Sequence, residues 1–379
     1  MTNGDAPPAG QPPELSAQPD EIGTVGIVGA GLIGTSIGMA LTDAGVDVVL
    51  RDRDPDQARV AVARRAGRLW TDRERVGHAV LAVPPHTVAE VLADLQRSDI
   101  AQTFSDVASV KAQIVTEARA LGCDLSTFCP AHPIAGRERG GAVSAQVDLF
   151  RDRMWVLCPV PETGEPARQA AATVARLCGA SSSQLDPVRH DELMARLSHL
   201  PQVVSSALAA QATAGLVDGE LALAGSGLRD TTRLADSDGL LWASILEGNR
   251  VPVADGIDRL VSVLTDLSTT LRGGSVEDVT GAVESLLVTG RSGRRKLPAK
   301  VGQPEPVWSW VGVVVPDRPG ELARLFDLVG AWGINVEDVR VEHSREELRG
   351  VLELAVQPET AQSLAARLQE SGWRAYQRE

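Results

Sequence analysis

The chain has 379 residues, which suggests two or three domains at roughly 100–200 residues each. Its formal net charge of −13, from 37 Lys and Arg against 50 Asp and Glu, repels nucleic acid, so an anionic ligand must be attracted by a local group of basic side chains. No apolar run approaches the roughly 20 residues of a membrane helix, and the four cysteines show no metal-ligand spacing. We therefore expect a cytoplasmic protein with reduced thiols, no metal, and no nucleic-acid or membrane partner.

Residues 1–21 are rich in Pro, Gly, Ala and Gln and are predicted to form a disordered tail. From residue 22 onward, apolar segments alternate with stretches of helical spacing. A helix is predicted at 33–44, and strands are predicted at 24–29, 46–51, 78–83, 102–108 and 127–131. Strands that alternate with helices indicate βαβ units and therefore a parallel sheet.

A glycine motif follows the first predicted strand. Gly29, Gly31 and Gly34 have the G-x-G-x-x-G spacing at the start of a helix, where glycines let the backbone approach a pyrophosphate. Asp52 ends the next strand and would bind ribose hydroxyls, which favours NAD, although the flanking Arg51 and Arg53 leave NADP open. We therefore predict an NAD-binding Rossmann domain over 22–187. Its expected cofactor contacts are Gly29, Gly31, Leu32, Ile33, Gly34, Asp52, Val83 and Pro84.

The composition changes near Pro187. Residues 188–289 are rich in Leu and Ala at helical spacing, and they are predicted to form an all-α domain that binds substrate and forms a homodimer. Residues 290–306 are basic and then rich in Pro, and they are predicted to be a linker. A final α+β unit is expected over 307–379.

Four short segments carry a resemblance to a known family. They are 105–111 (SDVASVK), 132–136 (HPIAG), 198–202 (SHLPQ) and 229–242 (RDTTRLADSDGLLW), and the pair His190-Asp191 precedes the third. In this order they resemble the prephenate dehydrogenase family over about residues 24–290. The resemblance implies oxidative decarboxylation of prephenate to 4-hydroxyphenylpyruvate with NAD, in tyrosine biosynthesis. Arogenate dehydrogenase, which gives tyrosine directly, stays open as an alternative.

His132 is the candidate catalytic base, because imidazole has a suitable pKa and the residue follows a strand at the ligand-binding edge of the sheet. The resemblance implies that Ser109 bonds this histidine and the substrate hydroxyl; a simple helix cap is the alternative. It also implies that His199 lies near substrate or nicotinamide. Pro201 removes the usual donor to the carbonyl of Leu197, so the helix should be distorted there.

Further substrate contacts are implied by the resemblance. Arg233 would bind a substrate carboxylate, and Arg229, one helical turn earlier, would assist it. Gln202 stands where many members have His and carries no charge. Glu138 matches an acidic position near the pocket, where it would repel a dianion or contact the amino group of arogenate.

Two neighbours of these motifs are expected to have other roles. An ideal helix places His190 about 180° from His199, so His190 is predicted to lie outside the pocket in a structural role. Lys111 is expected on the surface of the first turn of a helix, near the cofactor at most.

Residues 307–379 resemble an ACT domain, a βαββαβ module. The resemblance rests on 311–322 (VGVVVPDRPGEL) and on Gly330, Gly333, Ile334 and Asn335. It implies a regulatory site for tyrosine, with Asp317, Gly320 and Asn335 as candidate contacts. A plain dimerisation module, in which Asp317 and Asn335 serve only as turn formers, is the alternative.

Two other functions are weaker. A β-hydroxyacid dehydrogenase would need a lysine acid in the helical domain, but no lysine occurs between Lys111 and Lys296. A non-catalytic amino-acid sensor would be expected to lack His132 or the glycines, and both are present.

Overall fold

The computed structural model describes residues 22–71, 74–135, 140–297, 308–343 and 349–378. The predicted tail, Glu138 and most of the predicted linker lie outside these ranges. The chain divides into two compact units, Met1–Ser285 and Leu286–Glu379.

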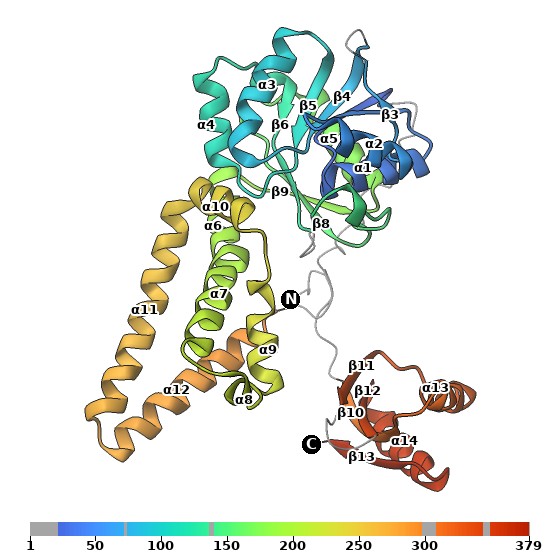
Figure 1. Ribbon diagram of the computed structural model, residues 1–379, viewed down its shortest axis with the longest axis vertical. Helices are drawn as coiled ribbons and strands as arrows, with labels where there is room; N and C mark the ends of the chain where they lie inside the picture. The colour runs from blue at the N-terminus through green and yellow to red at the C-terminus, as the bar shows by residue number, and fades with distance from the viewer. Residues whose placement is uncertain (1–21, 72–73, 136–139, 298–307, 344–348, 379) are drawn as a thin grey trace, which may run out of the picture. The chain divides into compact units, whose positions relative to one another are not determined.

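The first unit contains the predicted parallel sheet (Figure 1), which has six strands where five were predicted. Its order is β3-β2-β1-β4-β5-β6, the arrangement of a Rossmann fold. The strands are β1 (Val25–Val28), β2 (Val48–Arg51), β3 (Arg68–Leu69), β4 (Val76–Leu81), β5 (Ala101–Asp106) and β6 (Phe128–Cys129). Strand order reverses between β1 and β4, so the carboxyl ends of these two strands border the crevice where such sheets bind ligands.

Helices cover both faces of this sheet. One core contains α1 (Leu32–Asp43), α2 (Pro55–Ala63) and α5 (Glu165–Leu177), and the other contains α3 (Val88–Arg97) and α4 (Ala112–Ala120). Beyond β6, a three-stranded sheet is formed by β7 (Ala131–Pro133), β8 (Met154–Leu157) and β9 (Ser181–Gln184). His132 is the central residue of β7, so the predicted base lies on a strand just past the parallel sheet.

A buried ion pair connects these two sheets. Lys111 and Asp106 both have no exposed side-chain surface and form a salt bridge with each other. Asp106 Oδ1 accepts a hydrogen bond from the backbone nitrogen of Ala131 at 3.0 Å, and Lys111 Nζ donates to the carbonyl of Ala131 at 2.9 Å. The expectation of a surface lysine was wrong, because its side chain turns inward to a carboxylate that sequence spacing does not reveal.

The rest of the first unit is helical, as predicted (Figure 1). A π-helical segment, η5, interrupts the path from the first of these helices to the second. The elements are α6 (Pro187–Met194), η5 (Ala195–His199), α7 (Leu200–Thr213), α8 (Asp218–Leu221), α9 (Ser226–Thr232), the 3₁₀ turn η6 (Arg233–Ala235), α10 (Gly239–Gly248), α11 (Arg250–Gly273) and α12 (Val276–Arg294). The start of the predicted linker at residue 290 was wrong, because α12 continues to Arg294.

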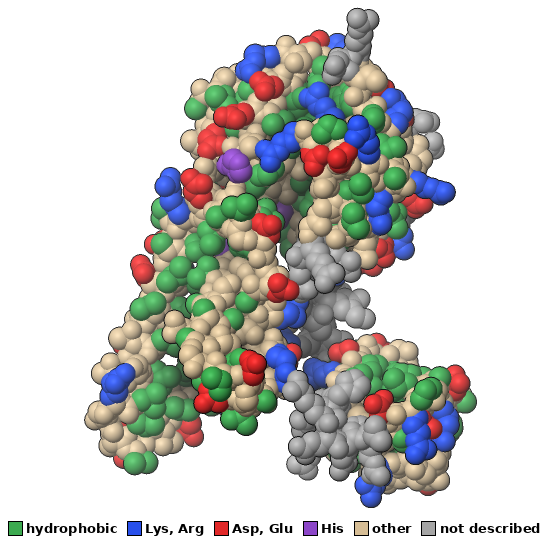
Figure 2. Space-filling model, in the orientation of Figure 1, with side chains coloured by type: hydrophobic (Ala, Val, Ile, Leu, Met, Phe, Trp, Pro, Cys, Tyr) green, Lys and Arg blue, Asp and Glu red, His purple; other side chains and the backbone are tan. Residues whose placement is uncertain are grey.

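Hydrophobic side chains remain on the outer surface of these helices, as Figure 2 shows. Strongly exposed examples are Leu240 (88%), Val251 (65%) and Val276 (86%). Apolar surface of this kind is typical of a helical region that packs against a partner. None of the helices in the described residues is both long and apolar enough to span a membrane.

The second unit has the predicted βαββαβ order. It consists of β10 (Ser309–Pro316), α13 (Glu321–Ala331), β11 (Asp338–His343), β12 (Arg349–Val356), α14 (Pro358–Glu370) and β13 (Arg374–Arg378). The antiparallel sheet has the order β11-β12-β10-β13. Alternate residues such as Val311 and Val313 bury one face of the sheet against Leu325 and Leu364 of the two helices.

We predict that Lys111→Met destabilises the protein by about 3–5 kcal/mol, because the buried carboxylate of Asp106 would lose its counter-charge. The measurement is urea denaturation of the full chain. Arg59→Met is the matched control, since Arg59 also pairs with an aspartate but is 69% exposed there. It should change stability little. Equal stabilities of the two variants would contradict a buried, strongly coupled pair.

Candidate active site

The three motif glycines at the start of α1 differ in the space around them: an added Cβ would fit at one and would clash at the other two. A Cβ at Gly29, where φ is +103°, would lie 2.2 Å from the carbonyl oxygen of Ala82. At Gly34 it would lie 1.9 Å from the carbonyl oxygen of Gly29, whereas at Gly31 it would meet nothing within 4 Å. The fold therefore requires Gly29 and Gly34, while Gly31 leaves free space at the N-terminus of α1, where a phosphate can approach the backbone.

Asp52 supports this loop from the end of β2. Its Oδ2 accepts a hydrogen bond from the backbone nitrogen of Ala30 at 2.6 Å, and its Oδ1 accepts one from Asp54 at 2.8 Å. The carboxylate keeps lone pairs for ribose hydroxyls. The guanidinium carbon of Arg51 lies 4.8 Å from the ring centre of Trp70, so Arg51 stacks on an aromatic ring. Arg53 is exposed.

The other predicted cofactor residues surround the same loop. Leu32 is buried and Ile33 packs against the core, both in the first turn of α1. Val83 and Pro84 follow β4, and a Cβ at Gly29 would lie 3.3 Å from a methyl group of Val83. These residues together fit a dinucleotide at the crevice between β1 and β4.

His132 is hydrogen-bonded to a second histidine. Its Nδ1 lies 2.9 Å from Nε2 of His190, and the ring centres are 5.1 Å apart at 73°. Burial lowers the pKa of His132 well below 6.5, and the charges of His190, Lys111 and His199 lower it further. His132 is therefore a neutral imidazole at neutral pH, in the form that can accept a proton.

His190 lies against His132, a contact that was not predicted, and its bonds to His132 and Asp191 fit the predicted structural role. The predicted rotation of about 180° between His190 and His199 was wrong, because it assumed an ideal helix and η5 makes one turn of π-helix between them. The distortion itself was predicted correctly, because Pro201 has no N–H to donate to the carbonyl of Leu197.

His199 is buried and bonded through one nitrogen only. Its Nδ1 lies 3.0 Å from the side-chain nitrogen of Asn249, while its Nε2 is buried without a hydrogen-bond partner among the described residues. Burial lowers the pKa of His199 to about 4; Asp191 opposes this shift and His190 adds to it. The ring of Trp242 is edge-on to His199, with ring centres 6.0 Å apart.

Asp191 connects the histidines to α4. Its Oδ1 lies 2.7 Å from Nδ1 of His190, and its Oδ2 accepts a hydrogen bond from the backbone nitrogen of Ala112 at 2.8 Å. The backbone nitrogen of Lys111 also donates to this carboxylate. Asp191 therefore supplies the capping oxygens of α4. Ser109 lies half-buried in the loop between β5 and α4, and it is not the cap of that helix.

Gln202 and the two arginines lie on separate elements. Gln202 is buried, and its side-chain nitrogen donates to the carbonyl of Leu234 in η6 at 2.7 Å. Arg233 begins η6, whereas Arg229 belongs to α9 and donates to the carbonyl of Ala224. Arg233 follows α9 directly with α-helical backbone angles, so the two arginines lie about one helical turn apart, as the sequence predicts. The amide of Gln202 holds the turn that carries Arg233.

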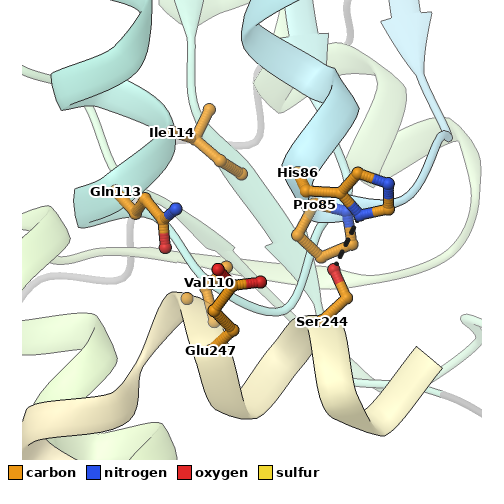
Figure 3. Close-up of a pocket in the computed structure, with 8 residues that line it drawn as sticks. Pro85, His86, Val110, Gln113, Ile114, Ser244 and Glu247 are labelled. Carbon is orange, nitrogen blue, oxygen red and sulfur yellow. Dashed lines mark hydrogen bonds between the residues drawn. The ribbon is translucent and has the colours of Figure 1, made fainter. Parts of the chain in front are cut away.

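The nucleotide-binding and helical parts of the first unit meet at a small pocket beside α10 (Figure 3). Figure 3 shows Gln113 and Ile114 on one side, Pro85 on another, and Glu247 of α10 below. Nδ1 of His86 lies 3.0 Å from the hydroxyl oxygen of Ser244. This contact ties α10, which carries Trp242, to the loop that follows Pro84.

Comparison with known proteins agrees with this geometry. The family described as the nucleotide-binding domain of prephenate dehydrogenase matches residues 37–184, and its dimerization domain matches residues 186–285. The probable prephenate dehydrogenase NovF of Streptomyces niveus is 36% identical over 357 residues, which are 92% of this chain and 98% of that protein. The chain belongs to the prephenate dehydrogenase family.

Two solved structures of similar proteins match most of this chain. Prephenate dehydrogenase from A. aeolicus, in complex with hydroxyphenyl propionate and NAD+, has a TM-score of 0.63 at 24% identity, and the match covers 74% of this chain and 99% of that one. Synechocystis arogenate dehydrogenase has a TM-score of 0.59 at 27% identity, with 72% and 99% covered. The first match shows a shared fold, and the second extends the likeness to an enzyme named for arogenate.

Of the residues predicted as regulatory contacts, Asp317 and Gly320 lie in the turn before α13, and Asn335 lies in the irregular segment before β11. Gly320 has φ +89° at the start of α13, a conformation that favours glycine, and Asp317 is exposed just after β10. The side-chain nitrogen of Asn335 donates to the carboxylate of Glu337. The described residues contain no group of His, Cys, Asp and Glu that could hold a metal ion.

Sequence reasoning on the prephenate dehydrogenase motifs missed three site residues. Asn249 lies between α10 and α11 and has no motif signal. Asp191 stands in the His190-Asp191 pair, which was noticed without its capping role. Lys111 lies in the SDVASVK segment, and only its buried carboxylate partner reveals its position.

Substitutions in the glycine loop should separate folding from cofactor binding. We predict that Gly31→Ala keeps the stability of the native chain but weakens NAD binding, because the added methyl group points into the ligand space. Gly34→Ala should lower stability, since its Cβ would overlap the backbone of Gly29. Thermal unfolding and NAD titration measure the two effects. Unchanged NAD affinity in Gly31→Ala would argue against a nucleotide at this loop.

Proposed function

We propose that the protein is an NAD-dependent prephenate dehydrogenase. It would oxidise prephenate at C4 and release the ring carboxylate as carbon dioxide, which leaves 4-hydroxyphenylpyruvate. Family membership supports this function, and so does a glycine loop with open space only at Gly31. The observation that carries the proposal is His132, a neutral imidazole held through Nδ1 by His190. Bound NAD would supply the nicotinamide that accepts the hydride.

His132 would act on the C4 hydroxyl of the substrate. As hydride leaves C4, positive charge develops on this carbon and the hydroxyl becomes strongly acidic, so a neutral base lowers the barrier. Loss of carbon dioxide from C1 returns an electron pair to the ring, which becomes aromatic. The product is a phenol, whose pKa of about 10 keeps it protonated at neutral pH. His132 therefore returns the proton that it accepted, and no proton is released overall.

The substrate carboxylates need donors in the same pocket. We assign Arg233 to one carboxylate, because a guanidinium can donate two parallel hydrogen bonds. Gln202 would orient this residue through its bond to Leu234 rather than contact the substrate as a cation. His199 would use its unpartnered Nε2 as a further donor to substrate or nicotinamide. Arg229 and Ser109 would assist at the edge of the pocket.

Arogenate dehydrogenase is the second candidate function, favoured by the likeness to the Synechocystis enzyme. Both substrates share the ring, the C4 hydroxyl and the ring carboxylate, so the role of His132 is unchanged. They differ only in the side chain, which carries a keto group in prephenate and an amino group in arogenate. Glu138, which lies outside the described residues, is the candidate contact for that amino group.

Assembly and regulation complete the proposal. The match to a dimerization domain and the exposed apolar side chains of α7, α10 and α11 support a homodimer. The βαββαβ order of the second unit supports an ACT domain, with Asp317, Gly320 and Asn335 as contacts for tyrosine. All four cysteines are free thiols, which is consistent with a reducing cytoplasm.

Turnover assays test the proposed reaction. We expect the native chain to form NADH from prephenate and NAD, measured by absorbance, and to be less active with NADP because Asp52 would repel a 2′-phosphate. His132→Ala should lower kcat by about 10²–10⁴-fold, as expected for loss of a general base. Turnover of arogenate alone would select the second candidate. Inactivity with both substrates would reject the function.

The lowered pKa of His132 predicts the pH profile. Since the base form persists below pH 6.5, kcat/KM should stay constant as the pH falls through neutrality and should decline only well below 6.5. An ordinary histidine would already have lost half of its base form at about 6.5. The measurement is kcat/KM at saturating NAD across this range, with an enzyme-free blank at each pH. An acid limb centred at or above 6.5 would contradict the prediction.

A further inference from the structure

We propose that Asp191 and Asn249 fix the two active-site histidines in opposite tautomers. His132 would carry its proton on Nδ1 and present a lone pair on Nε2, whereas His199 would carry its proton on Nε2. Asp191, His190 and Asn249 are then positioning residues, because they act on the substrate only through these two rings. The inference deepens the proposed function, and the tautomers can be measured without turnover.

The first chain of hydrogen bonds begins at the carboxylate of Asp191. Backbone N–H groups of Lys111 and Ala112 donate to it at the N-terminus of α4, where the helix dipole favours a negative charge. An ionised carboxylate can only accept hydrogen bonds, so Nδ1 of His190, at 2.7 Å, must carry a proton. In a neutral His190 the other nitrogen, Nε2, holds a lone pair.

This lone pair determines the state of His132. Nε2 of His190 lies 2.9 Å from Nδ1 of His132, and a hydrogen bond between them requires one proton. Because His190 has used its proton on Asp191, His132 must donate from Nδ1. The lone pair of a neutral His132 is therefore on Nε2, the nitrogen that can accept a proton from the substrate.

The second chain begins at the backbone carbonyl of Asp191. The side-chain nitrogen of Asn249 lies 2.7 Å from this oxygen, which can only accept, so the orientation of the amide is fixed. The same nitrogen lies 3.0 Å from Nδ1 of His199 and donates its second proton there. His199 must accept on Nδ1, so its own proton is on Nε2. That Nε2 is buried without a partner in the described part of the chain and is available as a donor.

Burial favours the neutral forms of His132 and His199; neighbouring charges add to this effect at His132, whereas Asp191 opposes it at His199. His132 is surrounded by His190, Lys111 and His199, and protonation of any of them opposes a charge on His132. Lys111 is neutralised by Asp106, and Asp191 is the anion that faces His190 and His199. Asp191 thus supports His132 as a base through its side chain and His199 as a donor through its backbone carbonyl.

A charged His190 would reverse this arrangement. An imidazolium paired with Asp191 would donate from Nε2 to His132, whose proton would then be on its own Nε2. His132 would face the substrate as a donor and could not act as a base. The proton positions on His132 therefore decide between the two states.

The first experiment reads the tautomers directly. The full chain is labelled with ¹⁵N-histidine, and two-bond ¹H–¹⁵N correlation spectra at pH 7.5 distinguish protonated from unprotonated ring nitrogens. The chain has six histidines, so single His→Gln variants assign His132 and His199. We expect a bare Nε2 on His132 and a bare Nδ1 on His199. The same tautomer on both rings, or a bare Nδ1 on His132, would overturn the proposal.

Asp191→Asn tests the role of the carboxylate with little change in shape. Its amide oxygen can still accept from α4, but its NH₂ group would donate to Nδ1 of His190. The proton of His190 would then move to Nε2, and His132 would switch tautomer. We expect the switched spectrum together with a loss in kcat on the order of 10³–10⁴-fold, as when a triad histidine takes the wrong tautomer. Asn249→Asp should switch His199 and leave His132 unchanged.

The control is Asp186→Asn. Asp186 is also an aspartate that caps a helix, since its side chain accepts from the backbone of Val188 and Arg189 at the start of α6, and this side chain is exposed. Its bond to the backbone nitrogen of His190 is made by its backbone carbonyl, which the Asn variant keeps. This variant should keep both tautomers and full activity. If Asp191 only caps α4, its Asn variant will keep the native tautomers and lose thermal stability alone, which would refute the proposal. Native tautomers in a protein that does not turn over prephenate would reject the function and not this inference.

Discussion

The active site depends on a pair of charges that have no contact with solvent. Moving a carboxylate and an ammonium group out of water costs several kcal/mol each, so such a pair persists only where it is fully bonded. Asp106 and Lys111 meet this condition by binding each other and both backbone groups of Ala131. The next residue is His132. The strand that carries the proposed base is therefore held at its first residue by electrostatics, and not by the parallel sheet, of which β7 is not a part.

Asp191 links the two parts of the catalytic unit. It belongs to α6 in the helical part, yet its carboxylate caps α4, which packs on the Rossmann sheet. The same carboxylate binds His190, and the backbone of Asp191 binds Asn249 at the start of α11. A carboxylate at a helix N-terminus is stabilised by the unpaired N–H groups there. Substrate and cofactor would meet where the helical and nucleotide-binding parts are in contact, so a small movement of either part would shift both histidines.

The sequence predicts those features that depend on local pattern. Alternating strands and helices predicted the parallel sheet, and the glycine spacing predicted the loop, because the close backbone contacts there need glycine at Gly29 and Gly34. Asp238, a residue type that is favoured at helix N-termini, caps α10. The distortion near Leu197 followed from Pro201 alone.

The features that were missed depend on contacts between distant segments. His190 was assigned away from the pocket because an ideal helix was assumed, and the rotation added by η5 cannot be read from residue types. The position of Lys111 follows from Asp106 and Ala131, which no periodicity identifies. Asn249 bonds a residue on another helix, Asp191, at a sequence separation of 58. Packing between distant segments determines these partners, so local patterns in a single sequence do not predict them.

The π-helical segment at Ala195–His199 also constrains how this enzyme can change. Such a segment is equivalent to an α-helix with one inserted residue, and each residue of an α-helix turns the chain by about 100°. Deletion of one residue there would restore a regular helix and keep the rotation of α7 relative to α6, because the wider π-helical turn already absorbs the extra residue. A regular helix would, however, place the ring of Pro201 against the carbonyl four residues before it. The π-helical turn therefore lets the chain hold both the extra residue and the proline while Gln202 keeps its contact with η6.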